Sequence, residues 1–175
     1  YDIRSAGIAA EDSMMTLEQA SKLSAAGLST VSEATNIQTS AMNAFASEGL
    51  TAAETADLLF KTVKFGKTNI AELSQAFGAT APIISSAGVQ LADFQAATAA
   101  LTTTGTPASQ AQNQLRASVI SLQKPTREMT KVFKELGVES GTELIKKYGD
   151  LGSAFTAVNG KISELNINTG KAWGS

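Results

Sequence analysis

The sequence contains no cysteine and no histidine. Without cysteine there is no disulfide framework, no cysteine-ligated zinc, no iron–sulfur site and no thiol nucleophile. Without histidine the histidine-based catalytic triads and the common histidine metal sites are excluded. We therefore expect no catalytic residues, no cofactor-binding site and no metal site, and we expect that the chain is not an enzyme.

Proline and aromatic residues are few, with 3 prolines and 7 phenylalanines among 175 residues. Small residues dominate instead, with 29 alanines, 19 threonines and 18 serines. Because alanine is the strongest helix former, this composition predicts an all-α fold. The length suits one domain, and the net charge of −2 points to no particular partner. The sequence starts at Tyr1 rather than at a methionine, so we expect a fragment of a longer protein.

Glycines recur at the ends of stretches with helical periodicity. A glycine that follows a helix can adopt the left-handed conformation at little cost. Thr30 with Glu33, and Thr51 with Glu54, have the spacing of a capping box at the start of the next helix. We therefore predict helix ends at seven glycines: Gly7, Gly27, Gly49, Gly66, Gly88, Gly105 and Gly137.

Apolar residues at helical spacing predict about nine short helices joined by these glycine corners. Pro82 falls inside one of them and should kink or break it, whereas Pro125 suits the first position of another. Residues 166–175 show no pattern except one apolar anchor, Trp173, and are predicted to be an irregular tail. The predicted helices are 11–26, 30–47, 51–65, 69–87, 91–104, 108–123, 125–136, 140–148 and 151–165.

The glycine spacing suggests a repeat inside the predicted helical domain, residues 1–165. From Gly27 onward the spacings alternate between 22 and 17 residues, which gives a helix-pair period of 39. This period defines two units, 27–65 and 66–104, with a third start at Gly105. Such a period fits a short stack of helical hairpins, and an irregular helical bundle is equally consistent with it.

Candidate binding motifs are scarce. Gly66-Lys67-Thr68 resembles the end of a phosphate-binding loop, but position 61 is lysine where that motif needs glycine. Lysines 61, 64 and 67 form a small basic ridge that suits a helix C-terminus. The basic residues of 124–134 alternate with glutamates, which indicates a solvated face. Glu139 and Glu143 would face the same way on one helix but do not by themselves indicate a hydrolase.

The stretch 73–115 is depleted in charge, because Asp93 is its one charged residue. Central helices covered by their neighbours would explain this composition. Two functional readings also remain open. The stretch could form a surface for self-association, or a hairpin that contacts a membrane, although polar residues interrupt any spanning helix.

Six collinear segments carry a resemblance to a known family. They are 61–68 (KTVKFGKT), 73–82 (LSQAFGATAP), 86–89 (SAGV), 99–108 (AALTTTGTPA), 122–128 (LQKPTRE) and 135–138 (ELGV). Together they resemble the core domain of the tail tape measure proteins of bacteriophages and prophages. The resemblance extends from Tyr1 to about Val138 and more loosely to the end.

The resemblance implies a structural protein of the virion tail that lies inside the tail tube, and in the host cytoplasm during assembly. Tape measure proteins set tail length and leave the tail on genome ejection. The implied partners are copies of the chain itself and other tail proteins: tube, baseplate and assembly chaperones. The alternatives are a membrane-active helical module that assists genome passage, and a helical-repeat scaffold that binds a protein partner. A ruler should be a long uninterrupted helix, so the glycine corners favour a compact element at one position along the tape.

Overall fold

The computed structural model describes residues 7–8 and 10–174. This part of the chain is all-α, with ten α-helices, one 3₁₀ turn (η1) and no strand. The prediction of the fold class is confirmed. The elements are α2 (Ala10–Ala26), α3 (Val31–Ala44), η1 (Ala46–Glu48), α4 (Ala52–Phe65), α5 (Ile70–Ser86), α6 (Leu91–Thr103), α7 (Ala108–Gln123), α8 (Arg127–Glu135), α9 (Gly141–Tyr148), α10 (Leu151–Glu164) and α11 (Thr169–Trp173).

Side-chain caps fix where the helices begin. The Thr30 hydroxyl accepts a hydrogen bond from the Glu33 N–H at 3.2 Å, and the Glu33 carboxylate accepts one from the Thr30 N–H at 2.8 Å. Thr51 and Glu54 repeat the arrangement at the start of α4. Both predicted capping boxes are therefore confirmed. At α8 the cap is Thr126, so the helix starts at Arg127 and Pro125 lies outside it, contrary to the prediction.

The glycine corners have two different physical causes. Gly7, Gly49, Gly88, Gly105 and Gly137 have positive φ, as expected for left-handed corners. Gly66 instead has extended backbone, and at the first corner Leu28 rather than Gly27 is left-handed. These two glycines are required by close packing. A Cβ on Gly66 would lie 2.6 Å from Thr102 Oγ1, and one on Gly27 would overlap the side chain of Ile70.

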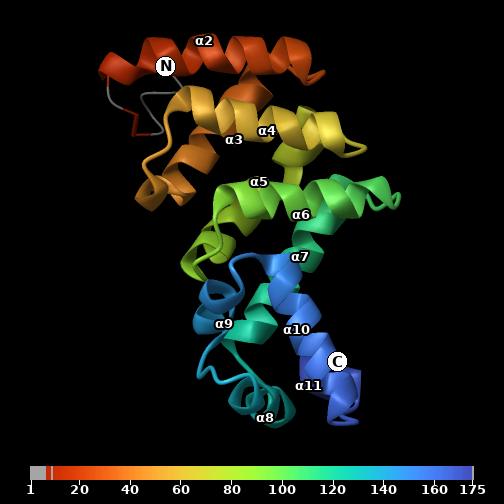
Figure 1. Cartoon of the computed structure of the whole chain (residues 1–175). Helices are drawn as coiled ribbons and strands as arrows, with labels where there is room; N and C mark the ends of the chain where they lie inside the picture. The colour runs from red at the N-terminus through yellow and green to blue at the C-terminus, as the bar shows by residue number, and fades with distance from the viewer. Residues whose placement is uncertain (1–6, 9, 175) are drawn as a thin grey trace.

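Helices α2 to α7 stack in two layers (Figure 1). In one layer α4 packs between α2 and α6, and in the other α5 packs between α3 and α7. Within this all-α bundle the two layers have the order of a short stack of helical hairpins. Phe77 and Phe94 join the two layers in the core, with ring centroids 5.7 Å apart. Helices α8 to α11 end the stack, with α9 and α11 against α7, and α10 against α6.

The last ten residues correct a prediction. Residues 166–175 were expected to be irregular, but Thr169–Trp173 forms helix α11. Asn168 caps it by accepting a hydrogen bond from the Lys171 N–H at 2.9 Å. Trp173 packs edge-on against Phe155, and its indole N–H donates to Asn159 at 3.1 Å. Tertiary contacts thus hold a helix that is too short to show a sequence pattern.

Pro82 does not break α5, which continues to Ser86. Proline lacks the N–H that would bond the carbonyl of Gly78, four residues earlier. Gly78 and Pro82 are both exposed, so water can satisfy that carbonyl.

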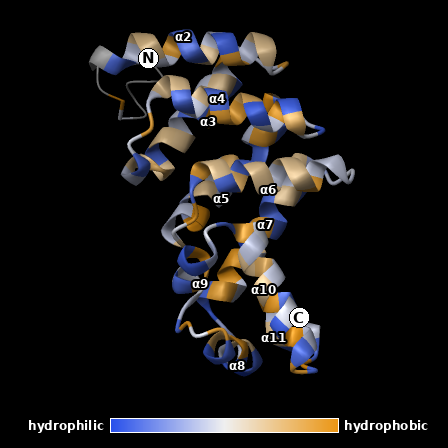
Figure 2. Cartoon of the chain, in the orientation of Figure 1, coloured by the Kyte–Doolittle hydropathy of each residue, from blue (hydrophilic) through white to orange (hydrophobic). Residues whose placement is uncertain are grey.

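The charge-poor stretch 73–115 forms most of α5, all of α6 and half of α7 in the middle of the stack. None of the large exposed apolar side chains of the described residues lies in it. Its composition is therefore that of central helices covered by neighbours. Figure 2 shows hydrophobic and hydrophilic residues interleaved along the helices. Within the described residues, no helix has the length and apolarity needed to cross a membrane.

Candidate functional site

The segment Gly66-Lys67-Thr68, which resembles the end of a phosphate-binding loop, forms a packed corner between α4 and α5. The Lys67 N–H donates a hydrogen bond to Thr102 Oγ1 at 3.1 Å, so it points at α6. The Thr68 hydroxyl hydrogen-bonds the Glu72 carboxylate at 3.0 Å, and Asn69, not Thr68, caps α5. The backbone N–H groups of Gly66 and Lys67 therefore donate to Thr62 and Thr102 within the chain, where a phosphate-binding loop would direct such groups at an anion.

The other charged candidates also have local roles. Lys61 pairs with Asp57 at 2.7 Å, and Lys64 lies over the Phe65 ring. On α8 Lys131 pairs with Glu128 at 2.9 Å. Across the described residues no group of three acidic side chains could hold a metal ion.

Glu143 has a capping function. Its carboxylate accepts a hydrogen bond from the Glu139 N–H at 2.7 Å, just before α9 begins. The backbone N–H of Glu143 donates a hydrogen bond to the Ser140 hydroxyl oxygen, which caps α9. Glu139 and Glu143 are therefore joined by a hydrogen bond from a backbone N–H to a carboxylate at the start of α9. They are not a pair of carboxylates that face each other across a cleft.

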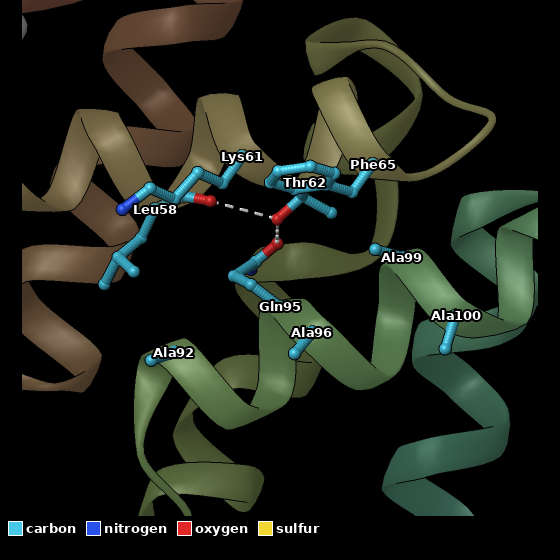
Figure 3. Close-up of a pocket in the computed structure, with 9 residues that line it drawn as sticks. All are labelled: Leu58, Lys61, Thr62, Phe65, Ala92, Gln95, Ala96, Ala99 and Ala100. Carbon is cyan, nitrogen blue, oxygen red and sulfur yellow. Dashed lines mark hydrogen bonds between the residues drawn. The ribbon is translucent and has the colours of Figure 1, made fainter.

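A groove lies between α4 and α6, and we call it groove A (Figure 3). Its volume is about 390 Å³. Most of the lining is apolar, and the Phe65 side chain at its edge is 66% exposed. The lining residues are Leu58, Lys61, Thr62, Phe65, Ala92, Gln95, Ala96, Ala99 and Ala100.

A second groove, groove B, lies between α2 and α4 and has a volume of about 240 Å³. Each of its eight lining residues is 39 positions before a residue that lines groove A. The lining residues are Gln19, Lys22, Leu23, Ala26, Ala53, Ala56, Asp57 and Phe60. The two grooves are therefore the same structural position in successive repeats, which supports the 39-residue period read from the sequence.

The side chains that line the two grooves differ. Phe60 lines groove B, whereas its equivalent in groove A, the larger of the two by volume, is the smaller residue Ala99. Ala56 of groove B is replaced by Gln95, which is 2% exposed. The Gln95 amide accepts a hydrogen bond from the Thr62 hydroxyl at 2.7 Å, and its Nε2 has no partner (Figure 3).

Buried glutamines hold neighbouring helices together elsewhere in the stack, and the sequence analysis did not identify them. Gln38 donates to the Ala52 carbonyl at 3.0 Å, and Gln112 donates to the Leu73 carbonyl at 3.2 Å. Each leaves its amide oxygen without a partner. A buried polar group that is only half satisfied is costly, so these residues set the alignment of helices more than they add stability. Their helical position among apolar residues was the available signal.

Asp93 marks the junction between the stack and the C-terminal helices. Its carboxylate accepts a hydrogen bond from the Leu151 N–H, at the start of α10, at 2.8 Å. Burial raises the pKa of Asp93, and the nearby charge of Asp150 raises it further, whereas the Leu151 hydrogen bond lowers it. The one acidic residue of the charge-poor stretch therefore helps to dock α10.

The described residues thus form a helical stack with grooves between α2 and α4 and between α4 and α6. Comparison with known proteins identifies the family of the chain. A family model described as phage-related minor tail protein matches residues 1–172. The chain belongs to this family.

A tape measure protein of Pneumococcus phage Dp-1 is 26% identical to the chain over 137 residues. The match covers 78% of the chain and 12% of that relative, so the chain spans about an eighth of the relative's length. No solved structure matches the chain. The resemblance to tape measure proteins is thus confirmed, and minor tail family membership indicates a structural protein of the virion tail.

Proposed function

We propose that the chain is a compact folded element of a tape measure protein. In this proposal the whole protein sets tail length during assembly and leaves the tail on genome ejection. The observation that supports a folded element is the stack itself, because its longest helices, α2 and α5, have 17 residues. A ruler built as one helix would instead extend 1.5 Å for every residue.

The proposed location is the interior of the tail tube, with the host cytoplasm as the site of assembly. The proposed partners are other tail proteins: tube, baseplate and assembly chaperones. Membership of the phage-related minor tail protein family supports an association of this kind. We also propose that the chain has no enzymatic role, which is in keeping with grooves that are mostly apolar.

The test is to change the number of repeats in the phage gene and to measure tail length by electron microscopy. One variant lacks residues 66–104, and a second carries that unit twice. If these residues acted as a ruler, tails would change by about 60 Å for 39 residues. We expect tails of unchanged length from at least the duplication variant, which removes nothing.

A matched control removes 39 residues from a part of the same gene that encodes long uninterrupted helix. That deletion should shorten the tails. Tail length that follows the repeat number in both variants would show that the stack is itself the ruler, and would refute the proposal.

A further inference from the structure

Groove A is more apolar than groove B, although the two occupy the same position in successive repeats. Gln19 and Asp57 line groove B, and their equivalents in groove A are Leu58 and Ala96. Groove A is lined entirely by residues 58–100, which lie far along the chain from both of its ends. The difference between the two grooves is therefore a property of the second repeat itself.

Groove A also has room where groove B carries a large side chain. Phe60 lines groove B, whereas its equivalent in groove A is Ala99, and the volume is about 390 Å³ in groove A against about 240 Å³ in groove B. At the edge the order is reversed, because the exposed Phe65 of groove A corresponds to Ala26 of groove B. Groove A thus combines apolar walls, an exposed aromatic edge and space for an apolar side chain from outside.

The two walls of groove A are helices that run in the same direction. Thr62 of α4 bonds to Gln95 of α6, and Lys67 after α4 bonds to Thr102 of α6, so residue numbers rise together along both walls (Figure 3). The α6 wall is a row of exposed alanines four residues apart: Ala92, Ala96 and Ala100. This row is about 12 Å long, which is about two turns of helix. A straight apolar groove of this length suits an amphipathic helix.

The charges at the edges of groove A are basic on one side only. Lys61 lines the groove on α4, and the Nζ of Lys64 lies 5.4 Å from the centroid of the Phe65 ring. Lys61 pairs with Asp57 at 2.7 Å, but no carboxylate among the described residues forms an ion pair with Lys64. No charged residue of α6 lines the groove. An occupant with carboxylates along the edge that faces α4 would therefore complement these charges.

We propose that groove A binds an acidic amphipathic helix of a partner protein. A large apolar side chain of that helix lies beside Ala99, and its carboxylates lie beside Lys61 and Lys64. A second copy of the chain fits less well. Phe65 is the one exposed phenylalanine of the described residues, and two copies that met through it would bring the same lysines together. This inference does not rest on the proposed tail function, because it follows from the comparison of two grooves in one chain.

The test is a selection of helical peptides from a randomised library against the chain, with Ala99→Phe as the counter-selection. This variant gives groove A the residue that groove B has at the same position, Phe60, so the repeat already accommodates it. We expect peptides that bind the parent at least about tenfold more tightly than the variant and that carry a large apolar residue and net negative charge. Ala96→Asp, at an exposed position, supplies the groove B residue Asp57 and should cause the same loss if Ala99→Phe does not fold.

A matched pair of charge variants tests the basic edge. Lys61→Glu in groove A and Lys22→Glu in groove B change the same position of the repeat, and each breaks one exposed pair, with Asp57 or Glu18. The measurement is fluorescence anisotropy of the tightest selected peptide. Lys61→Glu should weaken binding at least about tenfold, whereas Lys22→Glu should change it less than about twofold. Equal effects of the two variants, selected peptides of net positive charge, or no peptide that distinguishes Ala99→Phe would overturn the inference.

Other occupants of groove A are tested by sedimentation of the chain alone and with liposomes of neutral and anionic phospholipids. We expect neither a dimer nor liposome binding that depends on the groove. A dimer that Ala99→Phe abolishes would assign groove A to a second copy, and liposome binding that it abolishes would assign the groove to lipid. Either result would overturn the inference.

Discussion

Two kinds of glycine occur at the corners of the stack, and they differ in what a side chain would cost. Gly49 has a φ of +65° and open space around it, so a substitution there costs backbone strain alone. Gly66 has an ordinary backbone but no room, because an added Cβ would lie 3.1 Å from the Ala99 Cα as well as close to Thr102. The sequence pattern predicted a helix end at both positions but could not separate these causes.

Alanine substitutions should separate them. Gly66→Ala should lower the free energy of unfolding by about 1–3 kcal/mol through overpacking, and Gly49→Ala by about 1–2 kcal/mol through the left-handed backbone. Gly78→Ala is the control, since this helical glycine is exposed with no atom within 4 Å of an added Cβ. It should raise stability by up to about 1 kcal/mol. Chemical denaturation measures all three. A Gly66→Ala chain as stable as the parent would contradict the packing explanation.

Asp93 gives a pH dependence of unusual sign. Its pKa is raised in the folded chain, chiefly by burial, so the folded state holds its proton more tightly than the unfolded state. Its contribution to the free energy of unfolding is therefore largest at low pH and falls as the pH rises through the raised pKa. The exposed carboxylates of Glu33 and Glu54 act in the opposite direction, because capping hydrogen bonds from Thr30 and Thr51 lower their pKa.

Asp93→Asn isolates this effect. The asparagine carbonyl can still accept the Leu151 N–H, but it carries no charge to bury. Relative to the parent, the variant should gain stability as the pH rises from about 3 to 7, and the gain should be greatest at neutral pH. The measurement is denaturation of both chains across that range. A difference that shrinks toward neutral pH would show that the charged carboxylate stabilises the junction.

Among the elements, the nine predicted helices were placed closely by sequence. The predicted bounds agree with the structure to within one residue, except at the end of the predicted helix 30–47 and at the start of the predicted helix 125–136. Glycine corners, capping boxes and apolar spacing are local signals, because each of them lies in the same short segment whose backbone conformation it favours. Helix α11 could not be found in this way, because it depends on Phe155 and Asn159, which lie in another helix.

Only the 39-residue spacing between the two grooves could be predicted from the sequence. The 39-residue spacing was visible in the glycines, but which side chains line a groove depends on the rotation of each helix about its axis. The buried glutamines were missed for the same reason. Gln95 is polar, and the structure shows that it is buried where it packs between α4 and α6.

At the level of the α4–α6 pair, Gln95→Leu should stabilise the chain. It removes a buried Nε2 that has no partner, and the Thr62 hydroxyl keeps its bond to the Leu58 carbonyl at 3.1 Å. We expect a gain of about 1 kcal/mol in the free energy of unfolding. Gln75→Leu, at an exposed position of α5, is the comparison and should have little effect. Thermal and chemical unfolding would both report the difference. Destabilisation by Gln95→Leu would mean that the Thr62 bond is worth more than the unpaired amide costs.

For the whole molecule, the absence of cysteine and histidine and the engaged Lys67 corner predict a chain that binds no small cofactor. Calorimetric titrations with ATP, magnesium and zinc should give no heat of binding. The most sensitive position is Lys67, because it lies in the segment that resembles a phosphate-binding loop. A micromolar affinity for ATP that Lys67→Ala abolished would contradict the prediction.

The stack also has a mechanical consequence. Among α2 to α7 the principal contacts join helices that are one or two apart along the chain, so α2 to α5 are held chiefly by their near neighbours. A pull on the N-terminal end would load α2 first and then release the helices in order, in small steps rather than in one global rupture. Helices α2 to α5 can be drawn out at low force and can stack again afterwards, because the principal contacts that they must re-form join helices one or two apart along the chain.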